Sequence, residues 1–127
     1  MLPWDLEDWL TEEGDRVVRK RAARGDGALS DKERLLYEVW LFDTEVRNGG
    51  VSQYFGNNGS AQWATYVSAA QSKLPSFRTL AIAINQVLAC QQDPYEAVIE
   101  SGDVLEKAYG AVQAGLIGEL KSYLQQK

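Results

Sequence analysis

Apolar residues recur at intervals of three and four along most of this chain, which is the spacing of one helix face. The clearest series follows Ser30 and consists of Leu35, Leu36, Val39, Trp40, Phe42 and Val46. Ser30 and Glu33 match a capping box, so a helix is expected to begin there. Asn48-Gly49-Gly50 should end it, because these residue types accept the left-handed conformation. The wide apolar face predicts a buried central helix over about 30–48.

Shorter apolar patterns predict further helices on both sides of this one. An N-terminal stripe consists of Leu2, Leu6, Trp9 and Leu10. After the central helix, a helix over 61–74 should stop at Pro75, and Ser76 should cap the next one. Asp93-Pro94 has the residue types that open a helix, and Ser101-Gly102-Asp103 should interrupt the chain before the last helix.

No segment alternates apolar and polar residues as a half-buried strand does, so the predicted fold class is all-α. We expect a single domain over residues 1–127, a compact bundle of about five to seven helices around the central helix. Trp40 and Trp63 are expected in its core.

The residue types present argue against several kinds of chemistry. The chain has no histidine, which removes the commonest general base and metal ligand, and its one cysteine, Cys90, cannot form an internal disulfide. Asp31, Glu38 and Glu45 recur every seven residues, but we interpret them as the solvated side of the central helix. We therefore predict no enzyme activity, cofactor or metal site, with a histidine-free enzyme as the weaker alternative.

Charge and hydropathy limit the partners and the location. A net charge of -5 and a pI near 4.7 argue against direct nucleic-acid binding, which needs a basic surface. Acidic residues interrupt the N-terminal apolar residues, unlike in a signal peptide, and no apolar run reaches the length of a membrane span. A cytoplasmic bacterial-type protein is expected, and homo-oligomerisation is left open.

The acidic residues are confined to the two ends of the chain. Residues 49–92 contain no acid and two bases, whereas every carboxylate side chain lies in 1–48 or 93–127. Two sets repeat the intervals three, four and three: Asp5, Asp8, Glu12 and Asp15, then Asp93, Glu96, Glu100 and Asp103. On a helix, each set would form a row of neighbouring carboxylates. The rows are candidate partner-binding surfaces; the alternative is an ordinary solvated face.

The residues after the central helix allow two interpretations. The segment comprises Asn48, Gly49, Gly50, Gln53, Tyr54, Phe55, Asn57 and Asn58. As structure, Tyr54 and Phe55 fill the core and the Gln53 amide bonds backbone groups of the turn. As function, one aromatic ring and the amides of Asn57 and Asn58 line a recognition pocket. The structural interpretation is favoured, with Gly49 expected at positive φ.

This segment resembles the motif of the bacterial DNA mimic protein nineteen family, a helical family of largely unknown function. The shared residues are Asn48, Gly49, Gly50, Gln53, Tyr54, Phe55 and the turn Asn57-Asn58-Gly59-Ser60. The chain departs at Val51, where a larger aromatic is usual, and at Gly56, where the family tends to have an aromatic or polar residue. The resemblance implies sequestration of a transcription regulator by imitation of DNA.

We therefore expect a non-enzymatic interaction domain that binds a protein partner with a basic surface. The acidic rows could imitate backbone phosphates and occupy the basic face of a DNA-binding regulator. An antitoxin-like immunity protein that binds a basic toxin is the alternative, because a small acidic helical domain suits that role too.

Overall fold

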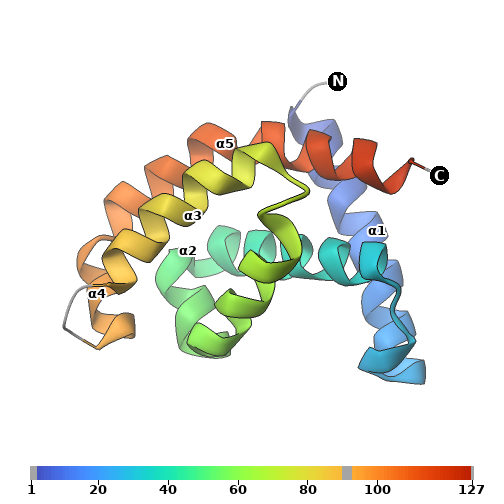
Figure 1. Cartoon of the computed structure of the whole chain (residues 1–127), viewed down its shortest axis with the longest axis horizontal. Helices are drawn as coiled ribbons and strands as arrows, with labels where there is room; N and C mark the ends of the chain where they lie inside the picture. Colours follow the sequence, from blue (N-terminus) through green and yellow to red (C-terminus); the bar gives the residue numbers. More distant parts are fainter. Residues whose placement is uncertain (1–2, 90–92, 127) are drawn as a thin grey trace.

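The computed structural model describes residues 3–89 and 93–126, and within these ranges it contains five α-helices and no strand. The elements are α1 (Pro3–Arg24), a 3-10 turn η1 (Asp26–Ala28), α2 (Asp31–Ala70), α3 (Pro75–Leu88), α4 (Pro94–Glu100) and α5 (Gly102–Leu124). Figure 1 shows α3 running along α5, with α2 beneath them and α1 at one side. The all-α prediction is confirmed, with the helix number at the lower end of the expected range. Cys90 lies outside the described residues.

The longest helix, α2, is broken twice. Backbone angles leave the helical region at Gly49, Gly50 and Gly59, so α2 consists of three successive helical segments. The first segment is the predicted central helix, and its capping box between Ser30 and Glu33 is present. Beyond Gly50 the chain turns, and the later segments fold back beside the first (Figure 1).

The conformation of the first break differs from the expected one. Gly49 has a φ of -162°, which any residue can adopt, whereas Gly50 has a φ of 85° and a ψ of 177°. Asn48 is not left-handed either, because no non-glycine residue of the described chain has positive φ. A Cβ at Gly49 would lie 2.0 Å from Oε1 of Gln53, so a side chain there would require the Gln53 side chain to move. The expectation of positive φ at Gly49 was therefore wrong by one residue.

Aromatic rings form the centre of the core. The Phe42 ring contacts the rings of Tyr54, Trp63, Tyr66 and Tyr109 at centroid distances of 4.8 to 5.9 Å. Phe42, Tyr54 and Tyr66 are fully buried, so the second and third segments of α2 supply much of the packing around the first.

The two tryptophans expected in the core differ in burial. Trp63 is 3% exposed, and its Nε1 donates a hydrogen bond to Asn85 at 2.8 Å. Trp40 is only half-buried, because its indole lies at the edge of the core against α1. There it covers Gly14, where a Cβ would lie 2.1 Å from Cδ1 of Trp40. Gly14 therefore allows the close approach of α1 and α2.

Two glutamates of α5 stabilise helix starts on other elements. Glu106 accepts a hydrogen bond from the backbone N–H of Val51 at 2.7 Å, just after the first break. Glu119 accepts from the Ser76 N–H at 2.8 Å and from its hydroxyl at 2.6 Å. Ser76 was expected to cap α3, but Leu74 is the N-cap and Pro75 the first helical residue. The carboxylate of Glu119, on another helix, therefore accepts the hydrogen bond of a backbone N–H group at the start of α3.

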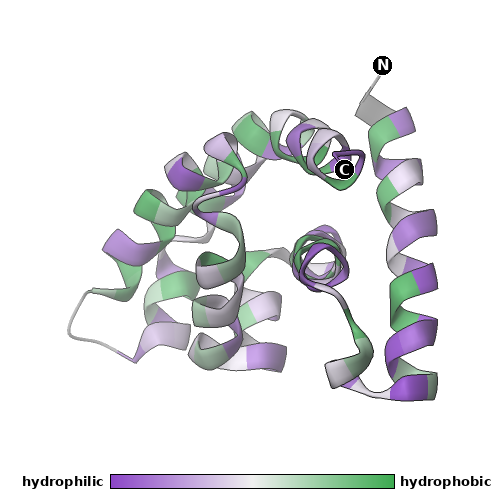
Figure 2. Cartoon of the chain, turned by 45° about the vertical axis from the view of Figure 1, so that its right-hand side comes forward, coloured by the Kyte–Doolittle hydropathy of each residue, from purple (hydrophilic) through white to green (hydrophobic). Residues whose placement is uncertain are grey.

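Glu33 connects α1 to the start of α2. One carboxylate oxygen accepts from the Ser30 N–H at 3.0 Å and from Lys20 Nζ of α1 at 2.8 Å. These bonds lower the pKa of Glu33 from 4.5 to about 2, with the Lys20 bond as the larger cause. Along α1, hydrophobic and hydrophilic residues alternate around the helix (Figure 2), so only one side of it packs against α2 and α5.

Replacing Gly59 by alanine should lower the free energy of unfolding by about 1–3 kcal/mol, because its φ of 80° with ψ of 177° suits glycine almost alone. Gly50→Ala should cost more, since its Cβ would also lie 2.6 Å from Oε1 of Glu106 and displace the carboxylate that caps Val51. Chemical denaturation measures both. Gly118→Ala, in open space on α5, is the control and should not destabilise. Equal losses at Gly50 and Gly59 would contradict the Glu106 contribution.

Glu33→Gln should keep the capping box, because glutamine also serves at this position, but it removes the ion pair with Lys20. We expect a loss of about 0.5–1 kcal/mol at pH 7. Because folding lowers the pKa of Glu33, its stabilisation is present above pH 4.5 and disappears as the pH falls toward 2. The stability difference between variant and parent should vanish over that interval. Asp15→Asn, which removes an exposed ion pair with Arg19, is the control and should change less.

Candidate protein-binding surfaces

The first acidic row lies along the outer side of α1. Asp5, Asp8, Glu12 and Asp15 are all exposed on this one continuous helix. With roughly 100° per residue, they occupy the side opposite the buried positions. Those buried positions are Leu6, Leu10, Gly14 and Val17. The row therefore faces solvent along its whole length.

The four carboxylates of this row differ in their ion pairing. Asp15 pairs with Arg19 at 3.0 Å, whereas Asp5, Asp8 and Glu12 form no ion pair within the described chain. The basic cluster that follows is largely neutralised, for example by pairs of Arg16 with Glu13 and of Lys20 with Glu33. The uncompensated negative charge thus lies in the first half of α1.

The second row is not a row on one helix. Asp93 is the N-cap of α4, Glu96 and Glu100 lie on α4, and Asp103 begins α5 beyond the interruption at Ser101. All four are exposed, and none forms an ion pair among the residues that the structure describes. The repeated intervals in the sequence therefore do not give the two rows the same geometry.

Apolar side chains are interspersed among the carboxylates of the second row. Tyr95 is 44% exposed, Ile99 51% and Val104 66%. Sequence reasoning missed these residues, because an apolar pair such as Tyr95 and Ile99 at i, i+4 is ordinarily assigned to the buried side of a helix. On α4 that side is formed instead by Ala97 and Val98. We call the exposed residues 93–104 the α4 surface.

The two acidic regions lie at opposite ends of the molecule. Figure 1, which has the longest axis horizontal, places α1 at one side and α4 at the other, and the rotated view of Figure 2 agrees. One flat partner cannot cover both at once. The rows are therefore separate candidate surfaces rather than one continuous track.

Two of the eight motif residues are buried, and the others are half-buried or exposed. Tyr54 is fully buried and Phe55 is 5% exposed, as the structural interpretation expected. Asn57 donates to Oε2 of Glu45 at 2.6 Å, and Asn58 to the backbone oxygen of Tyr54 at 3.0 Å. Both amides therefore bond within α2. Gln53 lies beside Gly49 and is half-buried.

Two carboxylates of the central helix are buried, which the sequence pattern did not indicate. Glu38 was assigned to the solvated side, but it is 3% exposed and both its oxygens accept from Gln62 Nε2, at 2.8 and 2.7 Å. Burial raises the pKa of Glu38, partly opposed by this bond. The expectation failed because the later segments of α2 fold over this side.

The second buried carboxylate, Asp43, joins α2 to α5. It is fully buried and accepts from the Tyr109 hydroxyl at 2.5 Å, from Gln113 Nε2 at 2.7 Å and from Arg47 Nε at 2.7 Å. Gln113 also donates to Glu7 of α1 at 2.9 Å. Asp43 accepts from donors on two helices and is the acceptor of the buried Tyr109 hydroxyl, so the cluster is a structural junction.

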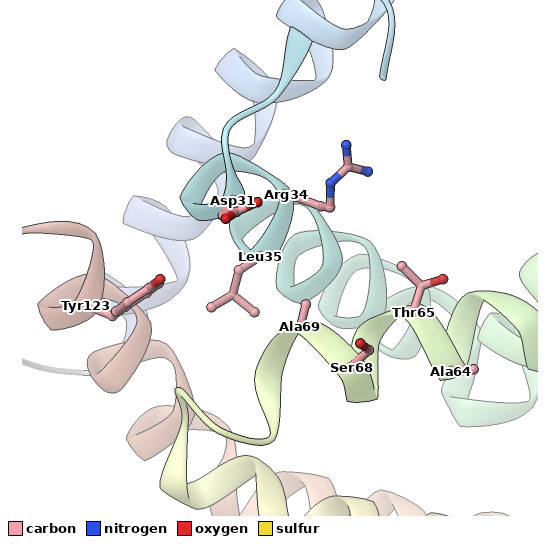
Figure 3. Close-up of a pocket in the computed structure, with 8 residues that line it drawn as sticks. All are labelled: Asp31, Arg34, Leu35, Ala64, Thr65, Ser68, Ala69 and Tyr123. Atoms are coloured by element: carbon pink, nitrogen blue, oxygen red, sulfur yellow. The ribbon is translucent and has the colours of Figure 1, made fainter. Parts of the chain in front are cut away.

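A cavity of about 540 Å³ lies between the first and third segments of α2 and the end of α5 (Figure 3). Its walls are mostly small side chains, and Arg34 is turned toward Asp26, with which it pairs at 2.8 Å. The described residues contain no group of three acidic or thiol side chains that could hold a metal. None of the described helices is long and apolar enough to cross a membrane.

The model of the DMP19-like protein family matches residues 27–124. The chain belongs to this family. Neither the curated proteins nor the solved structures contain a significant match. Within the DMP19-like chain, the α4 surface lies inside the matched region, whereas α1 with its acidic row precedes it.

Replacing Asp43 by alanine should lower the free energy of unfolding by about 2–5 kcal/mol, because it leaves the buried Tyr109 hydroxyl without an acceptor and also removes the bonds from Gln113 and Arg47. Tyr109→Phe removes a single donor and should cost about 0.5–1.5 kcal/mol. Urea unfolding followed by tryptophan fluorescence measures both. An Asp43→Ala variant as stable as Tyr109→Phe would show that Asp43 does not serve as a junction of several donors.

Proposed function

We propose that this DMP19-like chain is a protein-interaction domain that binds the basic, DNA-binding face of a regulatory protein. The observation that supports it most is the α4 surface, where exposed carboxylates that form no ion pair with the described residues alternate with exposed apolar side chains. Charge attracts and orients a basic partner, and apolar contact stabilises the complex once formed. Membership of the family adds support, because the α4 surface lies within the matched residues.

The α1 row offers a second, less dense acidic surface. Its four carboxylates span about 15 Å of helix, or one per roughly 5 Å. One strand of duplex DNA carries a phosphate per roughly 3.4 Å of axis, so the row is somewhat sparser than the strand it would imitate. It also lacks exposed large apolar residues among the described positions of α1. We therefore assign the main contact to the α4 surface and an auxiliary role to α1.

The proposal is tested with two matched variants in which each acidic set is changed to neutral amides. One carries the changes at Asp93, Glu96, Glu100 and Asp103, and the other those at Asp5, Asp8, Glu12 and Asp15. A partner is first captured on the parent chain and identified by mass spectrometry. Its affinity for the α4-surface variant should fall at least tenfold, and for the α1 variant less. Melting temperatures should hardly change, because solvated charges contribute little to stability.

Two further measurements distinguish mimicry from other acidic binding. Affinity for the parent should fall steeply with added salt, since exposed charges are screened beyond about 8–10 Å. A DNA duplex carrying the regulator's own site should compete with the chain for the regulator. Recovery of a toxin instead would favour the immunity alternative. If both variants bind like the parent at low and high salt, recognition does not use these carboxylates.

A further inference from the structure

A small pocket adjoins the α4 surface. It has a volume of about 170 Å³ and is lined by Phe55, Gly59, Ser60, Asp93, Pro94 and Tyr95. This is below the roughly 300–1,000 Å³ typical of small-molecule sites, and suits one inserted side chain. The second break of α2 forms one wall and the start of α4 the other.

Two glycines of α2 shape this pocket. At Gly56 a Cβ would lie 2.9 Å from Cε2 of Tyr95, so the missing side chain lets the Tyr95 ring lie against the helix. At Gly59 a Cβ would meet nothing within 4 Å, which leaves that wall open. The Tyr95 ring is thus held in place while 44% of the residue stays exposed.

The Asp93 carboxylate lines the pocket, and only one of its two oxygens accepts hydrogen bonds from described residues. Oδ1 of Asp93 accepts from the backbone N–H groups of Tyr95 at 2.9 Å and Glu96 at 3.3 Å. Oδ2 has no hydrogen-bond partner among the described residues. The sequence contains no Lys or Arg over 48–72 or 79–106, the segments that supply the pocket and the α4 surface. The local charge is therefore negative, and the first base after the second of these segments is Lys107 of α5, four residues beyond Asp103.

We propose that this pocket receives an arginine side chain of the protein partner. The guanidinium would stack on the Tyr95 ring and donate to Oδ2 of Asp93, while its aliphatic stem contacts Phe55 and Pro94. Arginine fits better than lysine, because its planar, weakly hydrated group both stacks on a ring and bonds a carboxylate. The inference deepens the proposed function and rests on it, since it names the residue that a basic partner inserts.

The test is an NMR titration of the isotope-labelled full chain with a probe peptide, an acetylated amide that carries one arginine between two leucines. We expect the amide resonances of Phe55, Gly59 and Tyr95 to shift with the arginine peptide. The matched lysine peptide should bind more weakly, and the neutral citrulline peptide hardly at all. No shift of these resonances at millimolar arginine peptide, or equal shifts with all three peptides, would overturn the proposal.

Three variants identify the contacts. Asp93→Asn keeps the helix cap but removes the charge, and should weaken the arginine peptide about fivefold or more. Tyr95→Ala should weaken it similarly, whereas Tyr95→Phe keeps the ring and should bind like the parent. Asp103→Asn, an exposed carboxylate outside the pocket, is the control and should change little. Loss of binding in Asp103→Asn equal to that in Asp93→Asn would contradict a specific pocket.

The same variants separate this inference from the proposed function. Suppose that a captured partner loses affinity for the four-residue α4-surface variant but not for Asp93→Asn or Tyr95→Ala. In that case the partner binds the α4 surface as proposed, but it does not insert an arginine into the pocket. If none of these variants affects the partner, the proposed function fails as well.

Discussion

The fold depends on the break of α2 at Gly50. A straight helix of 40 residues would be about 60 Å long and could not cover its own apolar face. The break lets Tyr54, Trp63 and Tyr66 return to pack around Phe42. It also frees the N–H of Val51 from intrahelical bonding, and Glu106 of α5 accepts that hydrogen bond. The core and the position of α5 are therefore linked through one turn.

Hydrogen bonds of polar side chains on α5 fix the positions of α2 and α3 relative to α5. Glu106 accepts a hydrogen bond at the first break of α2, and Glu119 accepts one at the start of α3. Tyr109 and Gln113 donate hydrogen bonds to the buried Asp43. These bonds satisfy polar groups that lie buried or half-buried between the helices. Apolar packing alone would tolerate some sliding of helices, whereas these bonds fix one arrangement.

Acidic side chains divide into two populations with different roles. Glu38, Asp43, Glu106 and Glu119 are wholly or partly buried and bond to protein donors. The carboxylates of the α4 surface are exposed and, within the described chain, unpaired. The exposed carboxylates of the α4 surface, together with Asp5, Asp8 and Glu12 of α1, are available to a partner, so net charge by itself overstates the surface that could imitate DNA. The exposed apolar residues of the α4 surface supply contacts that phosphates do not have.

The sequence by itself determined the helical class, the capping box at Ser30, the cap at Asp93, and the breaks near Gly50 and Ser101. These follow from local rules, because a cap or a glycine acts within one helical turn. The burial of Glu38 and the exposure of Tyr95 were decided only by the tertiary structure. Periodicity shows that a helix has two sides, but which neighbour covers each side depends on contacts between residues far apart in the chain.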